Sequence, residues 1–262
     1  MTTLTAGDEL LRSGDLDGAR AALIDAVKRN PGDQGARMFL WQLMALSGEW
    51  DKAISQLKML TQVSAEAQML ATVYGQAITA EKERAAAYAG ATPFPVLVAS
   101  SPWIEILAGA LSAGSAEATD QKRDEAFDAA GDTPGQVGEE NKFGWIADID
   151  SRLGPCFEAI VAGRWGLIPF EAVARIKTEG PRDLRDIIWL PVEMALRSGQ
   201  SVAALLPARY TGSETGSSAV RLGRATEWRA ADGGEEPIGQ RIWATDTGVE
   251  IGLLDFNEIQ FV

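Results

Sequence analysis

The sequence predicts an α+β protein in which an α-α superhelix precedes an α+β domain with a mainly antiparallel or mixed sheet. Residues 13–23 recur 34 residues later as residues 47–57, with Ser, Gly, an acidic residue, Asp, Ala and Leu in register. A period of 34 residues is that of the tetratricopeptide repeat, a pair of helices. Beyond residue 140, short apolar runs are separated by Gly, Pro, Asp and Asn, a pattern typical of strands joined by tight turns.

A composition shift separates these two parts of the chain. Residues 131–138 read Gly-Asp-Thr-Pro-Gly-Gln-Val-Gly and are rich in residues that end helices. We therefore expect a tetratricopeptide-like helical domain over residues 1–137 and an α+β domain over residues 138–262.

Helix boundaries in the first part follow from apolar spacing and from helix-ending residues. A Gly-Asp turn at residues 14–15 ends the first helix, and Asn-Pro-Gly at residues 30–32 ends the second, which we expect over 16–29. Two more helices are expected over residues 34–46 and 65–88. After a rigid Thr-Pro-Phe-Pro break, an apolar stripe from Trp103 to Leu111 and a helix from Ser115 to Ala130 predict a third, degenerate helical pair.

The third expected helix, residues 34–46, is apolar on more than one face, so its surplus apolar surface must be covered. In a tetratricopeptide array the first helix of each pair lines a concave groove, and such a groove suits an amphipathic helix. Register with the repeat assigns six residues to this groove: Leu4, Asp8, Leu11, Met38, Gln42 and Ala45. The alternative is that the helix over 65–88 fills the groove from within the chain, through the stripe Leu70, Val73, Tyr74, Ala77 and Ile78.

In the second part, we expect five strand-like runs and two interrupting helices. The runs are Trp165–Phe170, Ile187–Leu190, Ala203–Leu206, Ile238–Thr245 and Val249–Phe256. The helices are expected from Gly154 to Ala162 and from Pro191 to Arg197. Five of the eight tryptophans fall in this part and are expected to anchor its core: Trp145, Trp165, Trp189, Trp228 and Trp243.

Composition excludes several functions. The chain has no histidine, which removes imidazole bases and every His-containing metal site, and its single cysteine rules out an intramolecular disulfide. The net charge of −13 opposes binding to nucleic acid or to an anionic membrane. With no signal peptide or long apolar run at its start, the sequence predicts a cytoplasmic protein. The acidity is concentrated in residues 91–140, which carry 2 basic and 9 acidic side chains.

One group of carboxylates invites a chemical interpretation. Asp148 and Asp150 lie two residues apart, and Glu158 follows. Three carboxylates could hold Mg²⁺, which makes a metal-dependent hydrolase the alternative function. In the structural interpretation, Asp150 or Ser151 caps a following helix and Arg152 pairs with a carboxylate.

Several blocks of the C-terminal half resemble, in order and spacing, the ImpE family, also called SciE or TagJ. They are residues 145–155 (WIADIDSRLGP), 183–191 (DLRDIIWLP), 206–214 (LPARYTGSE), 226–228 (TEW) and 239–241 (GQR). Members of this family are accessory proteins of bacterial type VI secretion and begin with tetratricopeptide-like helices.

The resemblance implies a non-enzymatic adaptor with no cofactor. Family members are thought to bind the N-terminal helix of the small sheath subunit TssB and to be linked with ClpV, the ATPase that recycles the sheath. We therefore expect a helix-binding groove that includes Leu4, Leu11, Met38 and Gln42, or else a C-terminal binding surface. A third possibility is an assembly factor that self-associates through exposed tryptophans.

Overall fold

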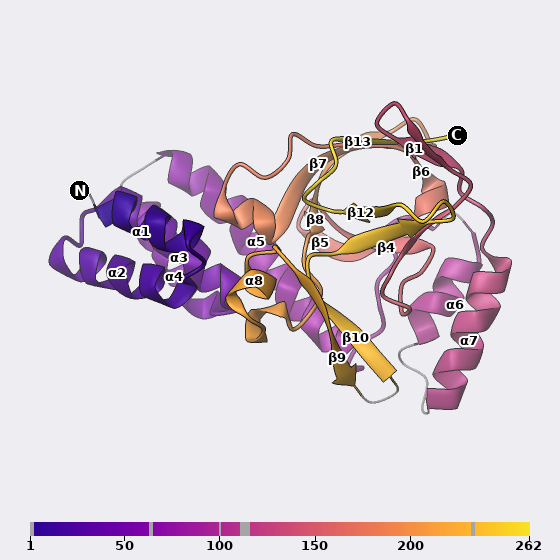
Figure 1. Ribbon diagram of the computed structural model, residues 1–262, viewed down its shortest axis with the longest axis horizontal. Coiled ribbons are helices and arrows are strands. Elements are labelled where there is room, and N and C mark those ends of the chain that lie inside the picture. Colours follow the sequence, from indigo (N-terminus) through magenta and orange to yellow (C-terminus); the bar gives the residue numbers. More distant parts are fainter. Residues whose placement is uncertain (1–2, 63–64, 100, 111–115, 232–233) are drawn as a thin grey trace.

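The computed structural model describes residues 3–62, 65–99, 101–110, 116–231 and 234–262 (Figure 1). Its N-terminal part consists of two helical hairpins that precede a long helix. These helices are α1 (Thr3–Arg12), α2 (Leu16–Arg29), α3 (Gln34–Leu46), α4 (Trp50–Leu60) and α5 (Ala65–Tyr88). The expected bounds of α2, α3 and α5 are confirmed. No helix within the described ranges is long and apolar enough to cross a bilayer.

The residues that the two repeats have in common produce the same turn after α1 and after α3. Gly14 and Gly48 have φ angles of 84° and 69° and end α1 and α3. After each glycine, the next backbone N–H donates back five residues, Asp15 to the Leu10 carbonyl at 2.8 Å and Glu49 to the Met44 carbonyl at 2.9 Å. This pattern is the Schellman motif, in which the residue after the helix has a left-handed backbone conformation. Glycine is favoured there because it has no Cβ that opposes this conformation. The repeat is therefore a repeat of helix ends as well as of helix faces.

The two turn glycines differ in their surroundings, which allows a matched prediction. A Cβ added at Gly14 would meet nothing within 4 Å, whereas one at Gly48 would lie 2.8 Å from Cγ of Glu214. We expect Gly14→Ala to lower the free energy of unfolding by about 1 kcal/mol through backbone strain alone. Gly48→Ala should cost about 1–3 kcal/mol more, because Glu214 must also shift. Urea unfolding of both variants measures the difference, and equal costs would show that Glu214 moves freely.

The C-terminal part is built on an eight-stranded sheet with strand order β2-β1-β13-β6-β7-β8-β4-β5, in which every pair is antiparallel. Its strands are β1 (Gly135–Val137), β2 (Asn141–Phe143), β4 (Cys156–Val161), β5 (Arg164–Pro169), β6 (Val173–Lys177), β7 (Trp189–Leu196), β8 (Ser201–Pro207) and β13 (Glu258–Phe261). The expectation of a mainly antiparallel sheet is confirmed.

Two smaller sheets complete this part. One has the order β12-β11-β3 and comprises β3 (Ile146–Asp148), β11 (Ile242–Thr245) and β12 (Glu250–Gly252). The other is a hairpin of β9 (Thr226–Ala231) and β10 (Gly234–Gly239), which projects away from the body of the molecule (Figure 1). The short helical elements are η1 (Phe170–Ala172), η2 (Leu184–Ile187), η3 (Ser213–Thr215) and α8 (Ser218–Arg221).

Both helices expected in the C-terminal part are strands. The expected helix from Gly154 to Ala162 is β4, which is buried along almost its whole length because helices cover one face of the sheet and the small sheet lies on the other. A run that is apolar apart from Glu158 fits a doubly covered strand as well as a helix. The expected helix from Pro191 to Arg197 covers most of β7, and the hydroxyl of Thr178 donates to the carbonyl of Pro191 at 2.8 Å. Pro191 precedes Glu193, the first residue of β7 that pairs with β6, so its missing N–H interrupts no pairing with that strand.

The expected third helical pair forms, but it does not extend the repeat array. Helices α6 (Trp103–Ala110) and α7 (Ala116–Ala129) pack against each other at the opposite end of the molecule from α1–α4 (Figure 1). Between them and the repeats, the chain runs along the edge strand β5. There, the N–H of Leu97 donates to the Leu167 carbonyl at 2.9 Å, and the N–H of Leu167 donates to the Pro95 carbonyl at 2.8 Å.

Two hydrophobic clusters form the core. The first joins the repeats to the sheet: Leu40 and Trp41 of α3 belong to it together with Ile160 of β4 and Trp189 of β7. The second lies between the eight-stranded and three-stranded sheets and surrounds Trp243. The helical and sheet parts are thus continuous through a shared apolar interior.

Candidate functional site: a hollow on the concave face of the repeats

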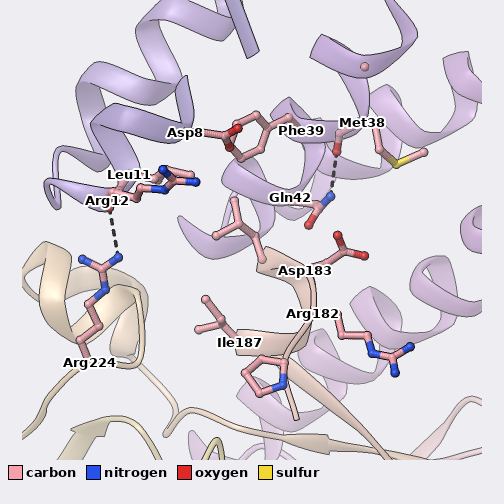
Figure 2. Close-up of a pocket in the computed structure, with 13 residues that line it drawn as sticks. Asp8, Leu11, Arg12, Met38, Phe39, Gln42, Arg182, Asp183, Ile187 and Arg224 are labelled. Carbon is pink, nitrogen blue, oxygen red and sulfur yellow. Dashed lines mark hydrogen bonds between the residues drawn. The ribbon is translucent and has the colours of Figure 1, made fainter. Parts of the chain in front are cut away.

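A hollow of about 560 Å³ lies between the repeat helices and the C-terminal part (Figure 2). Its upper wall comes from α1 and α3, and its lower wall comes from the segment before β7 and from the residues that follow α8. The lining residues are Asp8, Leu11, Arg12, Gly35, Met38, Phe39, Gln42, Pro181, Arg182, Asp183, Leu184, Ile187 and Arg224.

Three of the four residues that the sequence assigned to a partner groove meet in this hollow, namely Leu11, Met38 and Gln42. The fourth, Leu4, lies in α1, but its side chain is outside the described part of the chain. Met38 is half-buried, and its sulfur accepts a hydrogen bond from the indole N–H of Trp41 at 3.1 Å. The 34-residue register therefore places side chains from α1 and α3 on one surface.

The lower wall is formed by residues 179–187, which we call the strap. The strap is stiffened internally, because the backbone N–H groups of Arg182 and Asp183 donate to Oδ2 of Asp186 at 2.8 and 2.9 Å. It ends in η2, whose Leu184 and Ile187 pack against the first hydrophobic cluster.

Gln42 holds the strap to α3. Its Oε1 accepts from the backbone N–H of Arg185 at 3.0 Å, and its Nε2 donates to the Met38 carbonyl at 3.2 Å. The side chain is 5% exposed. Both ends of the amide are thus engaged within the chain, so Gln42 positions the strap and offers little surface to a ligand.

The alternative in which α5 covers the groove from within the chain holds for part of α3 and not for the hollow. Among the described residues, none from α5 lines the hollow. Helix α5 packs against α4 and β5, and its Tyr74 contacts Trp41 of α3 with ring centres 5.4 Å apart. Within its expected stripe, Tyr74, Ala77 and Ile78 are buried, but Val73 is 41% exposed. The strap forms one wall of the hollow. It also contacts α5, because the guanidinium of Arg185 lies 5.2 Å from the ring centre of Tyr74.

Charged side chains surround the apolar lining of the hollow. Arg12 and Arg224 lie at the α1 end, where Nη2 of Arg224 donates to the Leu11 carbonyl at 3.1 Å (Figure 2). Arg182 forms an ion pair with the exposed Glu179, and Asp183 forms one with Arg185. Sequence reasoning missed Arg224 and the strap, because no spacing rule brings residues more than 140 positions apart onto the repeats.

A second polar cluster lies at the junction of α5 with the sheet and is centred on Glu158. Arg84 of α5 reaches both carboxylate oxygens, through Nε to Oε1 at 2.7 Å and Nη2 to Oε2 at 3.0 Å. The indole of Trp165 donates at 2.9 Å and the hydroxyl of Tyr88 at 3.1 Å, and Arg241 forms a further ion pair. Burial alone would raise the pKa of Glu158, but Arg84 and Arg241 outweigh it and lower the pKa to about 2.

The other two carboxylates of the metal-site hypothesis also pair with arginines. Oδ2 of Asp148 accepts from Arg241 at 2.6 Å, and Oδ2 of Asp150 accepts from Arg152 at 2.7 Å. Burial raises the pKa of Asp148 to about 6, with Arg241 acting against the shift. Within the described ranges, no group of three or more His, Cys, Asp and Glu side chains is arranged to hold a metal ion.

These contacts match the structural interpretation of residues 148–158 in one respect and differ in another. The predicted pairing of Arg152 with a carboxylate is confirmed. Oδ1 of Asp150 also accepts from the backbone N–H of Arg152 at 3.1 Å, but the segment so capped is a turn that leads into β4 and not a helix. Arg152 bridges onward to Glu236 of β10 at 2.6 Å, linking the hairpin to the junction.

The expectation that five tryptophans anchor the core is correct for three of them. Trp165, Trp189 and Trp243 are at most 2% exposed, and Trp189 donates to Oε1 of Glu81 at 3.0 Å. Trp145 and Trp228 are 42% and 51% exposed, so for these two the prediction is wrong. Trp228 lies in β9 of the two-stranded hairpin, and Trp145 directly precedes β3 of the three-stranded sheet.

Paired helices with a concave hollow, closed from below by a sheet domain, form the architecture of a repeat scaffold. Residues 10–77 match the tetratricopeptide repeat, and residues 140–260 match the family described as ImpE protein. The chain is 43% identical to the type VI secretion system accessory component TagJ of Pseudomonas aeruginosa, over 97% of this chain and 90% of that protein. The chain belongs to the ImpE family.

The fold recurs in a solved structure. A crystal structure of a protein from Vibrio parahaemolyticus superposes with a TM-score of 0.85, covering 98% of this chain and 97% of that chain at 21% identity. The combination of repeat helices and antiparallel sheet is therefore a shared architecture.

Proposed function

We propose that the chain is a non-enzymatic adaptor of type VI secretion that binds an amphipathic helix of the small sheath subunit TssB in the concave hollow. The name of the Pseudomonas relative, an accessory component of that secretion system, supports the coarse role. On this proposal the protein works in the cytoplasm and is linked to sheath assembly or to ClpV-dependent recycling.

The observation that carries the proposal is the apolar lining of the hollow. Leu11, Met38 and Phe39 face Leu184 and Ile187 across an open space of about 560 Å³. Grooves in which apolar side chains from several elements converge are the usual receptors for one face of an amphipathic helix. Charged residues at both ends would fix the register of the bound helix.

Isothermal titration with a synthetic peptide of the N-terminal helix of the cognate TssB tests this proposal. We expect micromolar or tighter binding with a negative heat-capacity change, and none with a scrambled peptide. Met38→Asp should weaken binding about 10-fold or more, because it places a carboxylate against the apolar face of the ligand.

A matched control uses another methionine of the repeats, one that is exposed. Met59 of α4 is 48% exposed and does not line the hollow. Met59→Asp should therefore leave the affinity unchanged, and thermal melts of both variants check that the fold is retained. If Met38→Asp and the unmodified protein bound the peptide equally, the hollow would not be the binding site.

A further inference from the structure

The hollow has two walls from distant parts of the chain. Leu11 and Met38 of the upper wall belong to the repeats, and Leu184 and Ile187 of the lower wall belong to the strap. The walls are tied together through Gln42, which accepts from the backbone of Arg185. The lower wall is therefore fixed relative to the upper one before any ligand arrives.

The size of the hollow limits how much of a helix it can enclose. A helix about 10–12 Å across occupies about 400–600 Å³ per turn of 5.4 Å. A hollow of about 560 Å³ thus encloses about one turn, so a few side chains at spacings of three and four residues make the contact. A turn held between two walls touches both of them.

The charge at the α1 end of the hollow is opposite in sign to that of the whole chain, which is −13. Asp183 and Arg182 of the strap are paired with Arg185 and Glu179. Arg12 and Arg224 remain with Asp8, and no side-chain partner of Arg12 occurs among the described residues. A local excess of arginine on an acidic protein favours a ligand that brings a carboxylate to this end.

From these observations we infer that the strap is a specificity-determining wall of the site, and that the ligand is an amphipathic helix carrying an acidic side chain beside its apolar stripe. Ile187 contacts the stripe from below, and Arg12 receives the carboxylate. This inference rests on the proposed function, since it concerns the same hollow, and it makes recognition depend on the C-terminal part as well as on the repeats.

Titration of the full-length protein with two forms of the TssB helix peptide tests the inference. One peptide is unmodified, and in the other every Asp and Glu is replaced by Asn and Gln. We expect Arg12→Gln to lower the affinity for the unmodified peptide about 5-fold or more and to leave the affinity for the amide peptide unchanged. We expect Ile187→Asp to lower the affinity for both peptides about 10-fold. Ile187→Val should change neither affinity by more than about 2-fold.

The outcomes separate this inference from the proposed function. If Met38→Asp abolished binding while Ile187→Asp and Arg12→Gln bound normally, the hollow would be the site but the strap and the arginine would play no part. If neither peptide bound the unmodified protein, or if Met38→Asp had no effect, the proposed function would fail first. Because Ile187 is partly buried, Ile187→Ala and a thermal melt guard against a folding defect.

Discussion

Replacing Glu158 by glutamine is expected to destabilise the protein by about 3–5 kcal/mol at pH 7. The carboxylate is 1% exposed and accepts from Arg84, Tyr88, Trp165 and Arg241. A neutral amide leaves two buried guanidinium groups without their shared counter-charge, and its NH₂ group faces donors. Urea unfolding at pH 7 measures the loss.

The pH dependence of this difference follows from the pKa of Glu158, which the fold lowers from its ordinary value of 4.5 to about 2. Because the folded pKa is depressed, the stabilisation is complete above pH 4.5 and is lost as the pH falls toward about 2. A shift of this size corresponds to about 3 kcal/mol. The glutamine variant has no such titration, so the gap between the two proteins should narrow across this window.

An exposed ion pair provides the control. Glu193 is 60% exposed and lies 3.6 Å from Arg175. Glu193→Gln should change the free energy of unfolding by less than about 1 kcal/mol. A similar small effect at Glu158 would mean that the buried cluster contributes no more than a surface pair.

Replacing Trp189 by alanine should lower the free energy of unfolding by about 3–5 kcal/mol. Its indole is fully buried, its ring centre lies 5.9 Å from that of Trp50 and 5.7 Å from that of Tyr74, and its N–H donates to Glu81. The substitution would leave a cavity between the repeats and β7. It would also remove one hydrogen-bond donor from a carboxylate oxygen of Glu81.

Two further variants separate packing from hydrogen bonding at Trp189. Trp189→Phe keeps most of the ring contact but loses the donor to Glu81, and should cost about 1–3 kcal/mol. Trp228→Ala, at a tryptophan that is 51% exposed, should cost less than about 1 kcal/mol. Equal losses from Trp189→Ala and Trp228→Ala in urea unfolding would contradict the proposed role of Trp189 in joining the two parts.

Local rules predicted the repeats well because the signals are local. The bounds of α2 and α3 follow from residues that cap or end helices, such as Asp15, whose Oδ1 accepts from the Gly18 N–H at 2.8 Å. The same rules failed at β4, where burial on both faces removes the alternation that distinguishes a strand. They also failed at β7, although its residues from Pro191 to Leu196 alternate between more exposed and buried, because its pairing with β6 and β8 involves distant segments of the chain. There, tertiary packing decided the secondary structure.

The candidate site was only half predictable. Register within the repeats identified Leu11 and Met38, which line the hollow. The strap could not be placed, although residues 183–191 formed one of the blocks resembling the ImpE family, because its position depends on how the sheet packs against α5. For the same reason Gln42, expected to touch a partner, contacts the strap instead.

The long helix α5 begins as the last helix of the repeat array and ends inside the sheet domain, where Arg84 is held by Glu158. The array is therefore joined to the sheet domain at its C-terminal end through a buried ion pair. The same junction reaches the β9–β10 hairpin, which bears the exposed Trp228, because Arg152 pairs with both Asp150 and Glu236 of β10. Largely buried ion pairs thus connect the last helix of the repeats, the eight-stranded sheet and the hairpin in one continuous chain of contacts.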